Sequence, residues 1–136
     1  MTHERFRVLN TLGRWAGQKI DYEVSLAVRA TGRHLFLGGL TGLGLDGKLV
    51  GHGDPAAQAD QAMKNLKILL EEAGGELSCV CKITTYLLDR KDREAVYNTV
   101  AGHLKGVRPC GTGLIISGLA IPEMLVEFDV DAVLPT

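Results

Sequence analysis

Glu127 is the side chain in this sequence best suited to act as an acid or a base. It stands in an apolar segment between Val126 and Phe128. Asp129 and Asp131 fall on its side of an extended chain, because side chains alternate along a strand. On a solvated face these three acids would be ordinary surface charges. In a cleft between subunits, Glu127 would instead be placed to take a proton from water. It is therefore the candidate catalytic residue.

The three cysteines are other side chains whose type could act as nucleophiles or metal ligands. Cys79 and Cys81 fall on one face of an extended segment, but a structural zinc site uses about four ligands. Cys110 lies in the glycine-rich run 109–113, where no sequence feature places a histidine as its base. We therefore expect unreactive thiols, no disulfide framework and no metal site.

Gly42, Gly44 and Gly47 match the GxGxxG pattern of dinucleotide-binding loops. That chemistry needs a helix to open directly after the glycines, so that its N-terminus faces the phosphates. Here the next helix starts only near Pro55. The pattern therefore indicates a turn with Asp46 at its tip, and no cofactor is expected.

Two helices and several strands must position these residues. Asp54 is a good N-cap and Pro55 suits the first helical position, so a helix is expected from there to Gly74. One face of it carries apolar residues at helical spacing: Ala59, Ala62, Met63, Leu66, Leu69, Leu70 and Ala73. A second helix is expected between Asp89 and Gly106, with Val96, Val100 and Leu104 on one face.

Strands are expected where β-branched and apolar residues alternate with polar ones. Segments 25–30 and 34–39 should form a hairpin through the turn at 31–32. In segment 77–88, alternation puts Val80 and Tyr86 on the face opposite Ile83. The other expected strands are 6–10, 113–119 and 124–133, with a short one at 48–50. The order β-β-(β)-α-β-α-β-β predicts an α+β fold in which two helices cover one face of a mixed sheet. The other face also carries apolar side chains, so oligomerisation should cover it.

Length and charge limit the classes of function. The 136 residues suit a single domain covering 1–136. With 15 basic and 16 acidic residues, the chain has no general attraction for nucleic acid or anionic membranes. No segment approaches the ~18 apolar residues of a membrane span, and the start lacks the apolar core of a signal peptide. These features favour a cytoplasmic protein without nucleic-acid or membrane partners.

Five strings, in order, resemble the Rid family, also called YjgF/YER057c/UK114. Each is similar to a family segment, and together they span roughly residues 20 to 134: VSLAV at 24–28, LFLGGLTG at 35–42, the helix with Gln58, Asn65 and Leu66, KITTYL at 82–87, and RPCGT at 108–112 followed by LVEF at 125–128. The resemblance implies a chorismate-mutase-like (bacillus-type) α+β fold. It also implies a homotrimer with a barrel-like core and small-molecule ligands in clefts between subunits.

The resemblance further implies a chemistry. In active members an arginine pairs with a substrate carboxylate, while a glutamate and backbone groups place the water that attacks an imine carbon. Ammonia and a 2-oxoacid are released. Carried onto this chain, the catalytic residue is Glu127. The substrate-binding residues are Ser25, Gly38, Gly39, Tyr97, Cys110, Gly111 and Thr112.

Several of these positions depart from the family pattern. Gly111 stands in place of the arginine, Val24 in place of a tyrosine, Gly38 in place of a serine and Tyr97 in place of an asparagine. Losing a bidentate charge pair typically costs about 2–5 kcal/mol of binding, so an amino-acid-derived imine should bind poorly. The open space there suits a bulkier or less anionic ligand. Tyr22 lies on the same side as Val24 and partly fills its place.

Three functions remain in competition. The first is a divergent enamine or imine hydrolase, favoured because Glu127 is retained in an apolar strand. The second is a non-catalytic trimer that binds a metabolite in the same clefts. The third is the endoribonuclease activity attached to the family name, which the balanced charge argues against.

Overall fold

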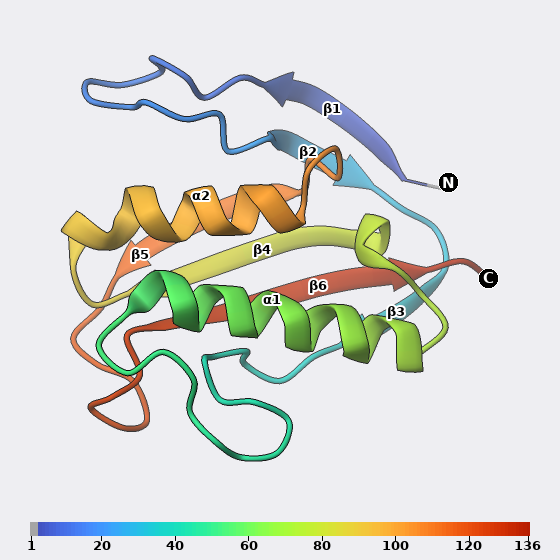
Figure 1. Cartoon of the computed structure of the whole chain (residues 1–136). Coiled ribbons are helices and arrows are strands. Elements are labelled where there is room, and N and C mark those ends of the chain that lie inside the picture. Colours follow the sequence, from blue (N-terminus) through green and yellow to red (C-terminus); the bar gives the residue numbers. More distant parts are fainter. Residues whose placement is uncertain (1–2) are drawn as a thin grey trace.

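The computed structural model describes residues 3–136, and in it two helices cover one face of a mixed sheet (Figure 1). This confirms the α+β architecture predicted from the sequence. The elements in chain order are β1 (Glu4–Leu9), β2 (Val24–Arg29), β3 (Arg33–Phe36), α1 (Pro55–Glu72), β4 (Val80–Leu87), α2 (Arg93–His103), β5 (Cys110–Ile115) and β6 (Val126–Leu134). Short 3-10 turns at Leu77–Cys79 and Arg90–Asp92 precede β4 and α2.

The main sheet has the strand order β3-β6-β4-β5. Only β4 and β5 run parallel, and α2 makes the crossover between them. Strands β1 and β2 form a separate antiparallel ribbon, which Figure 1 shows beyond α2. The ribbon is tied to the start of β5, since the Ser25 amide donates to the Pro109 carbonyl at 3.0 Å.

The core lies between the main sheet and the helices. Met63 and Leu66 of α1 and Phe128 of β6 are completely buried there. Helix α1 forms as predicted: Asp54 Oδ1 accepts the Ala57 amide at 3.1 Å, and Pro55 opens the helix. This interlocking of α1 with β6 fixes the sheet on which the candidate site residues stand.

The predicted hairpin between segments 25–30 and 34–39 is wrong. β2 pairs with β1, and β3 pairs instead with β6, where Leu35 faces Ala132. Gly32 explains the difference, because a Cβ at this residue would overlap the Leu134 carbonyl. The chain thus passes tightly against the end of β6 at Gly32 and crosses into the main sheet, rather than turning back on β2.

The predicted face of Val80 is also wrong. The pairing of β4 with β6 shifts register between Val80 and Lys82, which is a β-bulge. The extra residue turns Val80 into the core beside Ile83, while Tyr86 stays on the opposite side. Strict alternation from Cys79 to Leu87 could not anticipate this.

Other strand and helix boundaries differ by a few residues from those predicted. Asp89 caps the 3-10 turn, accepting the Lys91 amide at 2.9 Å, and α2 begins only at Arg93. The strand predicted at 113–119 begins at Cys110 and ends at Ile115. Segment 48–50 contributes only an isolated bridge between Leu43 and Leu49.

The loop before α1 is a turn, as the glycine pattern suggested. The Gly47 amide donates to the Gly44 carbonyl at 2.9 Å, and Gly47 has a φ of 83°. Two buried amides of α1 hold the loop: Asn65 donates to the Leu43 carbonyl at 2.8 Å and Gln58 to the Gly51 carbonyl at 3.0 Å. The family-like Gln and Asn of this helix are therefore structural.

The face of the main sheet away from the helices is here called the open face. Register places Phe36, Tyr86, Leu114 and Glu127 on it. Phe36 is 81% exposed and Leu114 42% exposed. None of the helices within residues 3–136 has the length and apolarity needed to cross a membrane.

Candidate functional site

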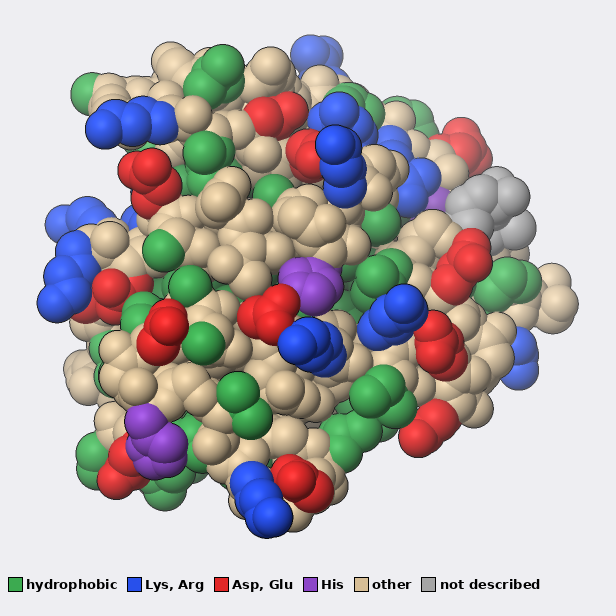
Figure 2. Space-filling view, in the orientation of Figure 1, with side chains coloured by type: hydrophobic (Ala, Val, Ile, Leu, Met, Phe, Trp, Pro, Cys, Tyr) green, Lys and Arg blue, Asp and Glu red, His purple; other side chains and the backbone are tan. Residues whose placement is uncertain are grey.

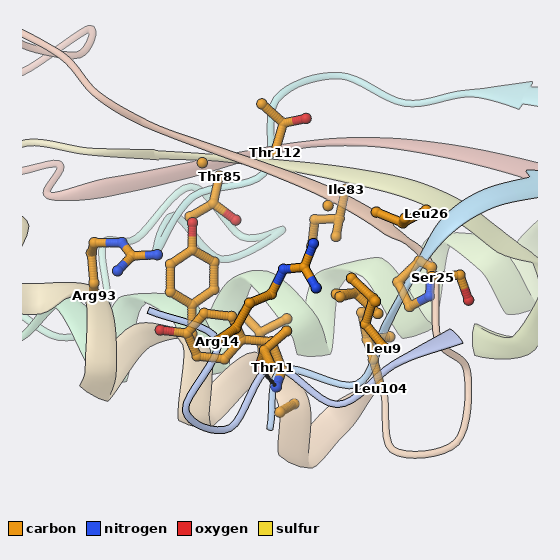
Figure 3. A pocket seen from close by; sticks show the side chains of 18 of the residues that line it. Leu9, Thr11, Arg14, Ser25, Leu26, Ile83, Thr85, Arg93, Leu104 and Thr112 are labelled. Atoms are coloured by element: carbon orange, nitrogen blue, oxygen red, sulfur yellow. Dashed lines mark hydrogen bonds between the residues drawn. The ribbon is translucent and has the colours of Figure 1, made fainter. Parts of the chain in front are cut away.

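A cavity of about 210 Å³ lies on the helix side of the sheet, between the β1–β2 ribbon, α2 and β5. Figure 3 shows its side chains converging from these elements. Its walls are mostly apolar. The lining residues are Leu9, Thr11, Arg14, Trp15, Tyr22, Val24, Ser25, Leu26, Ile83, Thr85, Arg93, Tyr97, Val100, Ala101, Leu104, Pro109, Gly111, Thr112 and Gly113.

Three aromatic rings stand at one end of the cavity. Tyr22 and Tyr97 stack with ring centroids 4.5 Å apart, and Trp15 meets Tyr22 edge-on at 6.3 Å. The guanidinium carbon of Arg93 lies 5.1 Å from the Tyr97 centroid and 5.7 Å from that of Trp15. These are cation–π distances, so the rings hold the Arg93 guanidinium in place.

Arg14 is the second cation of the cavity, and Figure 3 shows its side chain reaching into the centre. Among residues 3–136, no carboxylate lies within ion-pair distance of Arg14 or Arg93. Gly111 leaves its own position without a cation, but two arginines from other elements line the same cavity. Arg108 contributes nothing there, because it faces Glu23 at 3.8 Å.

The loop between β1 and β2 is built to present Arg14 and Trp15. The Thr11 hydroxyl donates to the Ile20 carbonyl at 2.9 Å and accepts the Tyr22 amide at 2.8 Å. The buried Gln18 side chain donates to the same Ile20 carbonyl at 2.6 Å. These bonds close the loop at its base, so its tip is held over α2.

Tyr97 reaches from α2 to the sheet. A Cβ at Gly113 would overlap the Tyr97 hydroxyl, so only glycine leaves room for the phenol there. Burial raises the pKa of the Tyr97 phenol, while the charge of Arg93 and a hydrogen bond with Thr85 act in the opposite direction. The phenol therefore stays protonated at neutral pH.

Glu127 and Gly39 lie together elsewhere, on the open face. A Cβ at Gly39 would overlap the Glu127 carboxylate, so glycine is what allows the two chains to approach. Paired hydrogen bonds between the backbones of Leu40 and Phe128, at 2.8 and 2.9 Å, hold them side by side. Gly38 precedes this pair and has open space around it.

The structure thus divides the candidate residues into two groups, which we call the cavity group and the glutamate group. Tyr97 and Gly111 belong to the cavity group, and Gly38, Gly39 and Glu127 form the glutamate group. Register puts Gly111 on the helix side of the sheet with Ile83, and Glu127 on the open face with Tyr86. The two groups are also two strands apart, or about 10 Å at the usual strand spacing.

The remaining candidates lie at the margins. Ser25 borders the cavity, but its hydroxyl donates to the Arg108 carbonyl at 2.7 Å and so ties β2 to β5. Thr112 borders it through its backbone, since its side chain points away (Figure 3). Cys110 lies on the open face, because side chains alternate along β5 and the next residue, Gly111, lies on the helix side; the Cys110 side chain is half-buried. Cys79 is fully buried. Burial raises the pKa of the Cys81 thiol.

Sequence reasoning missed Arg14, Trp15 and Arg93. One signal was available: Arg93 precedes Tyr97 by four residues, which places both on one side of a helix. Arg14 and Trp15 lie in a loop, where no periodicity relates a side chain to a distant one.

Comparison with known proteins gives a consistent picture. The family model described as Endoribonuclease L-PSP matches residues 20–134. A RutC family protein of Pyrococcus horikoshii is 30% identical over 77% of this chain and 82% of its own length. Another, from Synechocystis, is 35% identical over 65% of this chain and 68% of its own.

Solved structures agree on the fold. The Rid-family protein YyfB of Yersinia pestis is 27% identical and superposes with a TM-score of 0.83, covering 98% of this chain and 100% of the other. Rv2704 of Mycobacterium tuberculosis, a member of the YjgF/YER057c/UK114 family, is 26% identical over 97% of this chain and 99% of the other, with a TM-score of 0.66. This chain belongs to the Endoribonuclease L-PSP family, the group also called Rid or YjgF/YER057c/UK114.

Proposed function

We propose that this protein is a homotrimeric hydrolase of enamines or imines, with each site completed by two chains. The observation that carries the proposal is the division of the candidate residues between opposite faces of one sheet. A single chain cannot bring Glu127 to a ligand in its own cavity. A neighbouring chain that packs its open face beside the cavity can do so.

The exposed apolar side chains of the open face support such packing. Phe36 and Leu114 are too exposed for an isolated chain, and burying them on a second copy would be favourable. We therefore place the ligand at the boundary between subunits. The Endoribonuclease L-PSP name gives RNA as another substrate, but acidic and basic side chains are interspersed on the face seen in Figure 2. That mixture does not form the positive groove a polyanion needs.

The reaction follows from the chemistry of the two groups. The cavity would hold a 2-imino acid with its nitrogen protonated, and the neighbour's Glu127 would take a proton from water as the water oxygen bonds to the imine carbon and the C=N electron pair moves to nitrogen. Glu127 then gives this proton to the nitrogen of the resulting carbinolamine. The C–N bond breaks as the hydroxyl oxygen forms the C=O bond and returns its proton to Glu127, and ammonia and a 2-oxoacid are released. Glu127 serves as base in the first step and as acid in the second.

A direct assay tests this proposal. 2-Iminopropanoate is generated in situ by an amino-acid oxidase, and its disappearance is followed with and without the protein. We expect acceleration by the wild type and its loss in Glu127→Gln, which keeps the shape but not the base. Asp129→Asn is the matched control on the same strand and should keep full activity. Light scattering should give three times the chain mass of 14.6 kDa.

Two results would count against the hydrolase. No acceleration by the wild type would reject the activity and leave a metabolite-binding trimer as the better description. Acceleration that survives in Glu127→Gln would reject the assigned base.

A further inference from the structure

We propose that the cavity selects carboxylates that carry a branched or aromatic hydrophobic side chain, with Arg93 as the residue that recognises the charge. This deepens the proposed function, since it names the substrate class of the same site. The inference rests on three features of the cavity: an unpaired cationic end, an apolar floor of sufficient size, and a wall supplied by this chain's own N-terminal segment.

The cationic end calls for an anion. Arg93 is packed against the rings of Trp15, Tyr22 and Tyr97, and its guanidinium carbon is within 6 Å of all three centroids. Rings replace water around the guanidinium but do not neutralise it. Within residues 3–136 no carboxylate does so either, nor for Arg14. A planar guanidinium in this state is well suited to a bidentate carboxylate.

The floor calls for a hydrophobic side chain. It consists of aliphatic residues from the ribbon, β4 and α2: Leu9, Ile83, Val100, Ala101 and Leu104. The volume of about 210 Å³ exceeds the roughly 150 Å³ of an apolar cavity that holds benzene. A ligand with only a methyl group would leave most of this floor in contact with water. A branched or aromatic side chain would cover it.

The wall beside the arginines belongs to a part of the chain that the family model does not reach. Arg14 and Trp15 precede the matched residues 20–134. The bonds of Thr11 and Gln18 hold their loop in place over α2. Arg14 and Trp15 therefore add residues from outside the shared family segment to the wall beside Arg93, which lies within that segment.

Calorimetry with 2-oxoacids tests the inference without requiring catalysis. The probes are pyruvate, 4-methyl-2-oxopentanoate and the uncharged 4-methylpentan-2-one. We expect 4-methyl-2-oxopentanoate to bind on the order of tenfold to a hundredfold more tightly than pyruvate, from the added apolar area it buries. The uncharged ketone should bind at least about tenfold more weakly than the branched oxoacid, because it lacks the charge-assisted bonds.

Three variants assign these preferences to residues. Arg93→Gln should weaken both oxoacids by a similar factor of about ten or more, and Arg93→Lys should recover part of the loss. Ala101→Leu adds volume to the floor within α2. It should weaken 4-methyl-2-oxopentanoate and leave pyruvate nearly unchanged. Circular dichroism of each variant separates these effects from unfolding.

The outcomes separate this inference from the hydrolase proposal. Selective binding of the branched oxoacid supports the inference even if no imine is hydrolysed, in which case only the proposed activity falls. Imine hydrolysis with pyruvate binding as tightly as the branched oxoacid overturns the inference and leaves the activity standing. Equal binding of the uncharged ketone, or no binding of either oxoacid at millimolar concentration, also overturns it.

Discussion

The hydroxyl of Tyr97 occupies the space that a side chain at Gly113 would need. This contact joins α2 to β5 directly above the cavity. It sets how far Tyr97 reaches and so where Tyr22 stacks on it, 4.5 Å away. The rings that hold Arg93 are thus positioned by a glycine on the sheet.

Gly113→Ala should displace Tyr97 and destabilise the fold by about 1–3 kcal/mol, the usual cost of overpacking. Gly111→Ala is the matched control two residues away on the same side of β5. There a Cβ would meet only Val24 Cγ1, at an ordinary 3.5 Å. Urea unfolding of both variants checks this, and equal stabilities would show that the Tyr97 contact does not constrain the fold.

Gln58→Leu should destabilise the protein by about 2–4 kcal/mol. The Gln58 side chain is completely buried, donates to the Gly51 and Glu123 carbonyls, and accepts the Leu125 amide at 2.8 Å. Leucine would leave the Glu123 carbonyl and the Leu125 amide without partners, each at a cost of about 1–3 kcal/mol where water cannot reach, while the Gly51 carbonyl keeps the Asp54 amide. Thermal or urea unfolding measures the loss. Lys67→Ala, exposed on the same helix, should change stability by under about 0.5 kcal/mol, and a similar small change in Gln58→Leu would contradict the structural role.

Asp60 should make stability fall in acid. His103 Nε2 lies 2.7 Å from Asp60 Oδ1, linking α2 to α1, and Lys64 Nζ lies 3.0 Å from Oδ2. These bonds lower the pKa of Asp60 from its ordinary 3.8. A carboxyl with a depressed folded-state pKa contributes stability above its unfolded-state pKa, and this is lost as the pH falls through the folded one.

Asp60→Asn should therefore flatten the decline of stability below about pH 4. The effect is modest, because the pair is partly exposed and screened by solvent. Urea unfolding from pH 6 to pH 2 measures it, with the exposed Asp46→Asn as control. An unchanged acid slope in Asp60→Asn would show that this carboxyl is not linked to folding.

The sequence predicted α1 well because cap, periodicity and terminating glycines all agreed on one element. Alternation predicted where strands lie but not which strands pair. The predicted pairing of β2 with β3 was therefore wrong, because the chain passes at Gly32 into the main sheet. The bulge beside Val80 adds one residue to β4 and so turns the Val80 side chain to the opposite face of the sheet. A strict alternation of apolar and polar residues cannot predict such an extra residue. The two arginines of the cavity were not predicted for a related reason. Arg14 lies in a loop and Arg93 on a helix, and only the folded chain brings them to the same cavity.

Mixing two variants gives the most direct test of the proposal that two chains build each site. Glu127→Gln removes the proposed base, and Gly111→Leu fills the cavity while keeping its own Glu127. Each variant should be inactive alone. After mixing and reassembly, some boundaries pair an intact cavity from one chain with an intact Glu127 from the other. Imine hydrolysis should return in the mixture to a substantial fraction of the wild-type rate, and a mixture as inactive as its parents would contradict the proposal that two chains build each site.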